Sequence, residues 1–197
     1  MRLLIKNAKV YNKDYNGEIV DLFIDYGEII EIGKNIQTEV PEVINAKGKT
    51  LLPGLIDINC KICDPGFEYM EDINSISKSG AKGGFTTLVA SPDTNPVIDE
   101  KTVVKYIETK SRKESLINIL QLGGMTEGLK GIEIAEIGEM KKAGIVGISD
   151  GGTSLKDANL LSNILKYSIM FDLPVITHCD DMDISSTGVM NNGQVSL

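Results

Sequence analysis

The sequence predicts an α/β protein: a small N-terminal β module followed by part of a parallel (β/α)8 barrel. Residues 1–50 contain short strand patterns separated by polar turns, whereas residues 51–197 alternate between strand and helix patterns. The first of these later strands begins as a continuous apolar run, which is typical of a strand buried on both faces. Strands that alternate with helices form right-handed βαβ units and a parallel sheet.

The N-terminal module contains strand patterns rich in β-branched residues and bounded by Asn, Asp and Gly. A sheet of this size is stable only when its apolar face is covered. We therefore expect another segment to cover that face, as in the composite β-sandwich that the family resemblance given below implies. Its strands are expected at 3–10, 18–25, 28–33 and 42–45.

The second region predicts about five strands and four helices, whereas a closed barrel needs eight strands and typically about 250 residues. Half a barrel and an open flavodoxin-like sheet of five strands both fit this pattern. The family resemblance given below implies the half barrel. Apolar stripes at helical spacing support two of the helices, and Gly144 is placed to end one of them. Strands are expected at 51–58, 85–90, 117–122, 145–149 and 174–178, and helices at 71–81, 99–112, 132–143 and 157–171.

The composition restricts the partners and the compartment. A net charge of −8 argues against binding to nucleic acid or to anionic membrane surfaces. No apolar run approaches the roughly 20 residues that cross a bilayer, and the N-terminus has no secretory-signal pattern. Three cysteines, an odd number, fit reduced thiols better than a disulfide scaffold. We therefore expect a cytoplasmic protein.

Polar residues gather where the first barrel strand ends. With alternating side chains, Asp57, Asn59, Lys61 and Cys63 share one face of the strand. The C-terminal ends of barrel strands hold the active sites of this architecture. Polar groups there are costly unless they serve a site or satisfy one another, so the sequence predicts a pocket. Lys61 is expected either to pair with Asp57 or Asp150 or to extend out of the barrel mouth into water.

This stretch resembles the first barrel strand of the amidohydrolase superfamily, and of dihydroorotase in particular. The family pattern is Pro-Gly-x-x-Asp-x-His-x-His-x-Arg-x-Pro-Gly, and Pro53, Gly54, Asp57, Pro65 and Gly66 match it. The resemblance implies a two-zinc centre. Its activated water opens the ring amide of dihydroorotate and gives carbamoyl-aspartate, reversibly.

The chain departs from that pattern where the chemistry lies. The two metal-binding histidine positions hold Asn59 and Lys61, and the substrate-binding arginine position holds Cys63. An amide is a poor zinc ligand and an ammonium repels a cation. After the second strand, the family's substrate-binding asparagine is replaced by Asp93, while the pocket-lining Asn95 is kept.

The later matches are equally incomplete. The bridging-aspartate position falls on Gly151, with Asp150 one residue short, so we interpret Asp150 as a poor ligand. His178, at the end of the fifth strand, is the one matching metal ligand. The stretch 188–193 resembles a family loop. The resemblance places the remaining ligand histidine and the catalytic aspartate on later barrel strands, so we expect an oligomer or completion by another chain segment.

Three functional hypotheses follow. The first is a dihydroorotase-like protein without catalysis or cofactor, acting as a structural or regulatory partner of aspartate carbamoyltransferase; the resemblance suggests this partner. The second is an active cyclic-amide hydrolase with an unusual single-metal or metal-free site that uses His178, Asp150 and Lys61; zinc is the metal that the resemblance implies. The third is a small thiol-based metal or redox module, formed by Cys60, Cys63 and Cys179.

Overall fold

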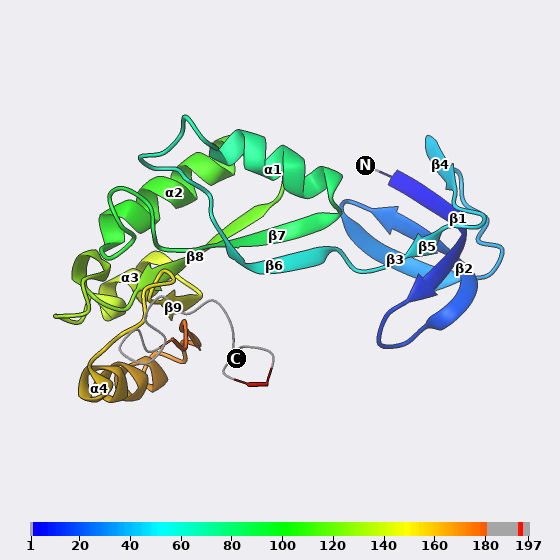
Figure 1. The fold of residues 1–197 in the computed structure, drawn as a ribbon. Coiled ribbons are helices and arrows are strands. Elements are labelled where there is room, and N and C mark those ends of the chain that lie inside the picture. Colours follow the sequence, from blue (N-terminus) through cyan, green and yellow to red (C-terminus); the bar gives the residue numbers. More distant parts are fainter. Residues whose placement is uncertain (1, 181–192, 195–197) are drawn as a thin grey trace. The chain divides into compact units, whose positions relative to one another are not determined.

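The computed structural model describes residues 2–180 and 193–194. Most of the 188–193 stretch therefore lies outside the described residues. The chain divides into two compact units, Met1–Gly54 and Leu55–Leu197, each with its own sheet. Figure 1 shows the ribbon of both units.

The first unit is a five-stranded sheet formed by β1 (Arg2–Tyr11), β2 (Asn16–Asp25), β3 (Glu28–Gly33), β4 (Glu42–Asn45) and β5 (Thr50–Leu51). β1 and β3 flank β2 antiparallel, and β4 and β5 pair in parallel with β1. The four strands predicted in residues 1–50 all form. A small core packs against the sheet: Ala8, Val10, Val20, Leu22 and Ala46.

The single strand predicted at 51–58 is wrong, because the chain changes sheet there. Leu51 pairs with Val10 in the first unit, and Leu55 starts β6 in the second. Pro53 has no backbone N–H to donate to a neighbouring strand, and Gly54 weakens strand structure. Pro53 and Gly54 therefore interrupt the strand between Leu51 and Leu55.

The second unit is a curled parallel sheet of β6 (Leu55–Cys60), β7 (Phe85–Ala90), β8 (Asn118–Gly124), β9 (Gly147–Ser149) and β10 (Val175–Ile176). Its order is β10-β9-β8-β7-β6, so each strand lies beside the next one in the chain. Its helices are α1 (Ile73–Lys82), α2 (Lys101–Glu114), α3 (Ile137–Ala143) and α4 (Ala158–Ile169) (Figure 1). Five parallel strands and four helices confirm the predicted α/β class.

The core of the second unit lies between the sheet and its helices. Its fully buried side chains include Ile98 before α2, Met125 after β8 and Ile148 in β9. At ~25 cal/mol per Å² of apolar surface removed from water, such side chains contribute roughly 1.5–3 kcal/mol each. This packing fixes the strand ends that carry the predicted site.

The apolar run predicted that β6 is buried on both faces, and this prediction is wrong. Leu55, Ile56 and Ile58 are 50%, 60% and 62% exposed. The reason is that β6 is an edge strand, which pairs with β7 alone among the described strands. Its apolar side chains therefore have a neighbouring strand on the β7 side only, among the described strands.

The third helix begins at Ile137 rather than near residue 132. Ile134 bridges to Thr126, and the Ala135 amide donates to the Met125 carbonyl at 3.1 Å. Pairing with the segment after β8 thus replaces the first helical turn. The predicted end is confirmed, because Gly144 has φ of 117° and caps the helix in the left-handed conformation.

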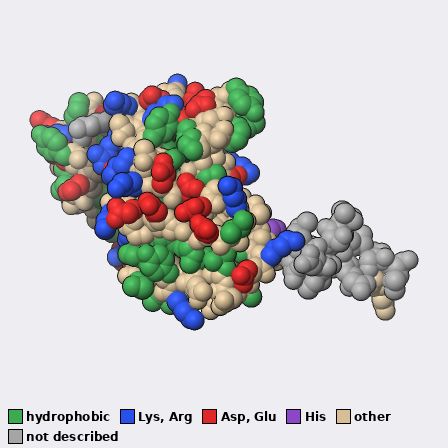
Figure 2. Space-filling view, turned by 90° about the vertical axis from the view of Figure 1, so that its left-hand side faces the viewer, with side chains coloured by type: hydrophobic (Ala, Val, Ile, Leu, Met, Phe, Trp, Pro, Cys, Tyr) green, Lys and Arg blue, Asp and Glu red, His purple; other side chains and the backbone are tan. Residues whose placement is uncertain are grey.

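Charged side chains of both signs are interspersed over the face shown in Figure 2.

α4 buries Ile164 fully, whereas Leu165 and Ile169 of its predicted apolar stripe are exposed. Among the described residues, no helix is both long enough and apolar enough to cross a membrane.

Candidate functional site at the strand ends

The predicted pocket residues follow the C-terminal ends of neighbouring strands in the second unit. Lys61 comes directly after β6, Asp93 follows β7, and Gly151 follows β9. The parallel sheet brings these ends to one edge. A cavity of about 260 Å³ opens there, lined by Lys61, Ile62, Cys63, Phe67, Met70, Asp93 and Thr94.

Lys61 and Asp93 form an ion pair across this cavity. The Lys61 Nζ atom lies 2.6 Å from Oδ2 of Asp93. The hydrogen bond to Asp93 raises the pKa of Lys61. Burial acts to raise the pKa of Asp93, but hydrogen bonds from Lys61 and Ser91 outweigh it and lower that pKa. Both groups are therefore charged at neutral pH. The expected pairing of Lys61 with Asp57 or Asp150 is wrong.

The alternation that put Lys61 and Cys63 on one face with Asp57 fails for a local reason. β6 ends at Cys60, and its register with β7 is irregular between Asp57 and Cys60. Beyond it, Ile62 is buried and Cys63 adopts a left-handed conformation with φ of 57°. Lys61 and Cys63 thus belong to a loop, where strand periodicity does not apply.

Asp57 and Asn59 remain on β6. Asp57 is half-buried, and its Oδ1 accepts a hydrogen bond from the Asn59 backbone at 3.0 Å. Asn59 itself is exposed. Neither of them lines the cavity that Lys61 and Asp93 share.

Gly151 lies beside Asp93. A Cβ atom built on Gly151 would be 3.4 Å from the Asp93 Cβ and 2.7 Å from Cδ1 of Leu129. With φ of +67°, Gly151 also holds a conformation that other residues rarely adopt. Positions 61, 93 and 151 therefore meet in one place, and position 151 has little room for a side chain.

Asp150 is buried, and its carboxylate faces the end of β10. It accepts hydrogen bonds from the Thr177 hydroxyl, from the His178 backbone at 2.8 Å and from the Gly152 backbone at 3.0 Å. Both oxygens are thus engaged. Asp150 anchors the chain where β10 ends.

His178 contacts that anchor through its backbone amide. Its side chain is 59% exposed, and Nε2 lies 4.0 Å from Oδ2 of Asp180. The structure gives its side chain no contact with the Lys61–Asp93 pair among the described residues.

Asn95, predicted to line the pocket, instead contributes its backbone to the neighbouring loop. The Asn95 amide donates to the Pro65 carbonyl at 3.0 Å. A Cβ on Gly66 would lie 2.1 Å from the Asn95 carbonyl oxygen, so this approach requires glycine at position 66. The loops that follow β6 and β7 are joined here as well as at Lys61 and Asp93.

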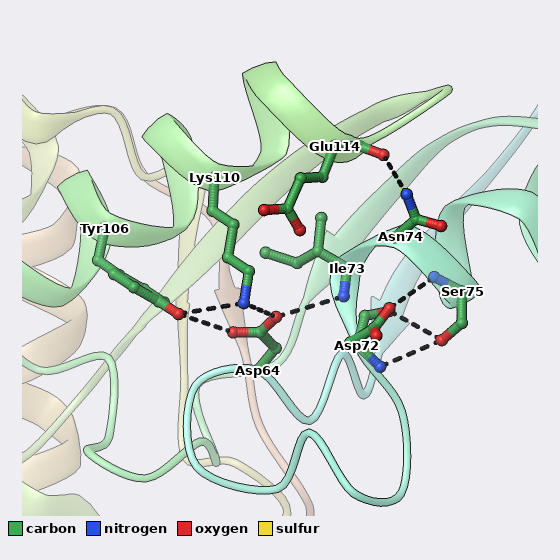
Figure 3. A network of polar contacts seen from close by, with 8 residues as sticks. All are labelled: Asp64, Asp72, Ile73, Asn74, Ser75, Tyr106, Lys110 and Glu114. Atoms are coloured by element: carbon green, nitrogen blue, oxygen red, sulfur yellow. Dashed lines mark hydrogen bonds and ion pairs between the residues drawn. The ribbon is translucent and has the colours of Figure 1, made fainter.

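Sequence reasoning missed the network that holds the first of these loops. Asp64 is fully buried and its carboxylate contacts Lys110 at 2.8 Å, the Tyr106 hydroxyl at 3.2 Å and the Ile73 amide at 3.4 Å. Figure 3 shows Tyr106 and Lys110 reaching from α2 to this carboxylate. The i, i+4 spacing of Tyr106 and Lys110 was the available signal.

The thiols are not arranged for reactivity. Burial, with a smaller effect of nearby Asp57, raises the pKa of Cys60 to about 11. Burial also raises the pKa of Cys63, and Cys179 is exposed. In the described part of the chain, no three His, Cys, Asp or Glu side chains are grouped as metal ligands would be.

The fold is similar to that of solved hydantoinase and dihydroorotase structures. L-Hydantoinase from Arthrobacter aurescens aligns with a TM-score of 0.78 at 21% identity, over 94% of this chain and 44% of that one. A dihydroorotase crystal structure aligns at 0.67 and 17% identity, over 91% and 51%. The half barrel predicted from the sequence is thereby confirmed.

The sequence comparisons then give the family. The Dihydro-orotase-like family model matches residues 48–196, and the chain belongs to that family. Dihydroorotase of Acetivibrio thermocellus is 46% identical over 97% of this chain and 45% of its own length. That of Aquifex aeolicus is 41% identical over 100% and 46%. The chain thus spans about half the length of the curated relatives it matches.

Proposed function

We propose that this chain is a non-catalytic member of the dihydroorotase-like family, which acts in the cytoplasm as a structural or regulatory partner of aspartate carbamoyltransferase in pyrimidine biosynthesis. The observation that carries the loss of catalysis is the Lys61–Asp93 ion pair of 2.6 Å. By the family resemblance, an ammonium there stands where a neutral imidazole would bind metal.

The rest of the donor set supports the same proposal. Asn59 offers an exposed amide and Gly151 offers no side chain. The carboxylate of Asp150 is already engaged by Thr177 and the His178 backbone. Zinc sites need several neutral imidazoles, thiolates or carboxylates converging at about 2.0–2.3 Å. These residues do not fit a two-zinc centre.

Substrate recognition is altered in the same direction. Cys63 replaces the family's arginine and cannot form the bidentate contact that holds a carboxylate. Asp93, which replaces an asparagine, is paired with Lys61 and has no amide N–H to donate to an anionic substrate. The cavity that these residues line is thus poorly suited to dihydroorotate or carbamoyl-aspartate.

The direct test measures zinc and turnover on full chain purified without chelators. We expect less than about one-tenth of a zinc per chain and no cyclisation of carbamoyl-aspartate. The control is the full-length dihydroorotase of Acetivibrio thermocellus, prepared identically. Stoichiometric zinc in this chain, or turnover, would instead support an active hydrolase with an atypical site.

The partnership is tested separately. Co-expression with aspartate carbamoyltransferase, followed by size-exclusion chromatography, is expected to give co-elution of the two chains. Elution of each alone at micromolar concentration would contradict the partnership and leave the catalytic question to the zinc assay.

A further inference from the structure

We infer that Lys61 and Asp93 form an internal charge pair that replaces a divalent cation in this pocket and holds its two loops together without metal. The inference deepens the proposed function. The test of this inference measures folding stability, whereas the proposed function is tested by zinc content and turnover. One can therefore fail while the other stands.

The first step concerns the loops. Lys61 belongs to the loop after β6 and Asp93 to the loop after β7, and these strands are parallel neighbours. Backbone hydrogen bonds join these segments from the Ser91 amide to the Cys60 carbonyl and from the Asn95 amide to the Pro65 carbonyl. The Lys61–Asp93 pair adds a side-chain contact between the same two loops.

The second step concerns burial. The Asp93 side chain is 23% exposed and the Lys61 side chain is 73% exposed. A carboxylate withdrawn this far from water needs a cation or several donors to remain charged. Lys61 provides that cation, with its own charge still largely hydrated.

The third step concerns position. Gly151 lies beside Asp93, because a Cβ built on Gly151 would be 3.4 Å from the Asp93 Cβ. By the resemblance, positions 61 and 151 each donate to metal in the family. Here one of them carries a positive charge, the other carries no donor, and Asp93 neutralises the first. A dication entering this place would have to displace the ammonium from Asp93 and then lie close to it, which electrostatic repulsion opposes.

The experiment is a double-mutant cycle on the full chain in urea, using Lys61→Met, Asp93→Asn and both together. We expect Lys61→Met to lower the folding equilibrium constant about twofold to fivefold, as for a largely exposed pair. The double variant should lose less than the two single losses combined. Neither zinc nor EDTA should move the wild-type urea midpoint.

The exposed pair of Lys142 and Glu139, 2.7 Å apart on α3, provides the matched control cycle. We expect smaller coupling there, because neither loop of the pocket is involved. Lys61→Arg keeps the positive charge and should retain the wild-type midpoint even if Lys61→Met fails to fold.

Three results would overturn the inference. The first is coupling no larger than in the control cycle. The second is a Lys61→Arg variant as unstable as Lys61→Met. The third is a wild-type midpoint that rises with micromolar zinc, since a ligand stabilises only the state that binds it.

Discussion

The buried carboxylate of Asp64 lies 2.8 Å from the ammonium of Lys110, which α2 holds over it. Tyr106, one turn earlier on the same helix, donates to the other oxygen of Asp64 at 3.2 Å. The carboxylate also accepts from the amide of Ile73, where α1 begins. One side chain thus joins the loop after β6 to two helices, and through that loop it positions Lys61 and Cys63.

Lys110→Met should destabilise the chain by about 2–3 kcal/mol, below the roughly 3–5 kcal/mol for breaking a fully buried pair. Asp64 is 0% exposed and would lose its cation, but the Lys110 side chain is 24% exposed and water screens part of the effect. Urea denaturation measures the change. Lys105→Met, which removes an exposed pair with Glu108 on the same helix, should cost under about 1 kcal/mol. Equal losses would contradict a special role for Asp64.

Stability should fall at alkaline pH through Lys110. The hydrogen bond to Asp64 raises the pKa of Lys110 in the folded chain. A raised folded pKa stabilises the fold fully below the unfolded value of about 10.4 and loses that contribution as pH rises above it. Urea midpoints from pH 9 to 11.5 should therefore decline more steeply for wild type than for Lys110→Met. Parallel curves would show that Lys110 is not responsible.

Gly66→Ala should be among the most damaging single substitutions, at about 2–5 kcal/mol. Gly66 has φ of +98°, and an added Cβ would lie 2.1 Å from the Asn95 carbonyl oxygen, which is backbone and cannot rotate away. Gly84→Ala separates the two causes, since Gly84 has φ of +85° with no atom within 4 Å of the added Cβ. It should cost only the strain, about 1–2 kcal/mol. Thermal and urea denaturation of both variants would decide.

Alkylation should be slow at Cys60. With its pKa raised to about 11 from an ordinary 9.0, the thiolate fraction at neutral pH falls by about two orders of magnitude. Brief iodoacetamide treatment of native protein, read by peptide mass spectrometry, should modify exposed Cys179 well before Cys60. Rapid modification of Cys60, with loss of bound metal, would revive the thiol-module hypothesis.

The sequence predicted where the site lies better than it predicted the contacts within it. Because parallel strands end at one edge, residues following β6, β7 and β9 had to converge, and positions 61, 93 and 151 do. The partner of Lys61 could not be predicted in the same way. The strand stops at Cys60, and from there the loop path decides which carboxylate an extended lysine reaches.

Two further differences have the same origin in tertiary contacts. The apolar stripe near residue 132 was helical in spacing, but Ala135 pairs with Met125 instead. The Asp64 network joins residues far apart in the chain. The local sequence Asp64-Pro65-Gly66 indicates only a turn. Local pattern predicts local structure, whereas these contacts depend on which segments the fold brings together.

The order of the parallel sheet has a consequence for how the chain assembles. Each strand from β7 to β10 lies beside the strand made just before it. Synthesis proceeds at about 5–20 residues per second. When each new βα unit leaves the ribosome, the strand that it pairs with has therefore already been made. The sheet can grow in the direction of translation, with β6 as its starting edge, and no strand has to wait for a distant partner.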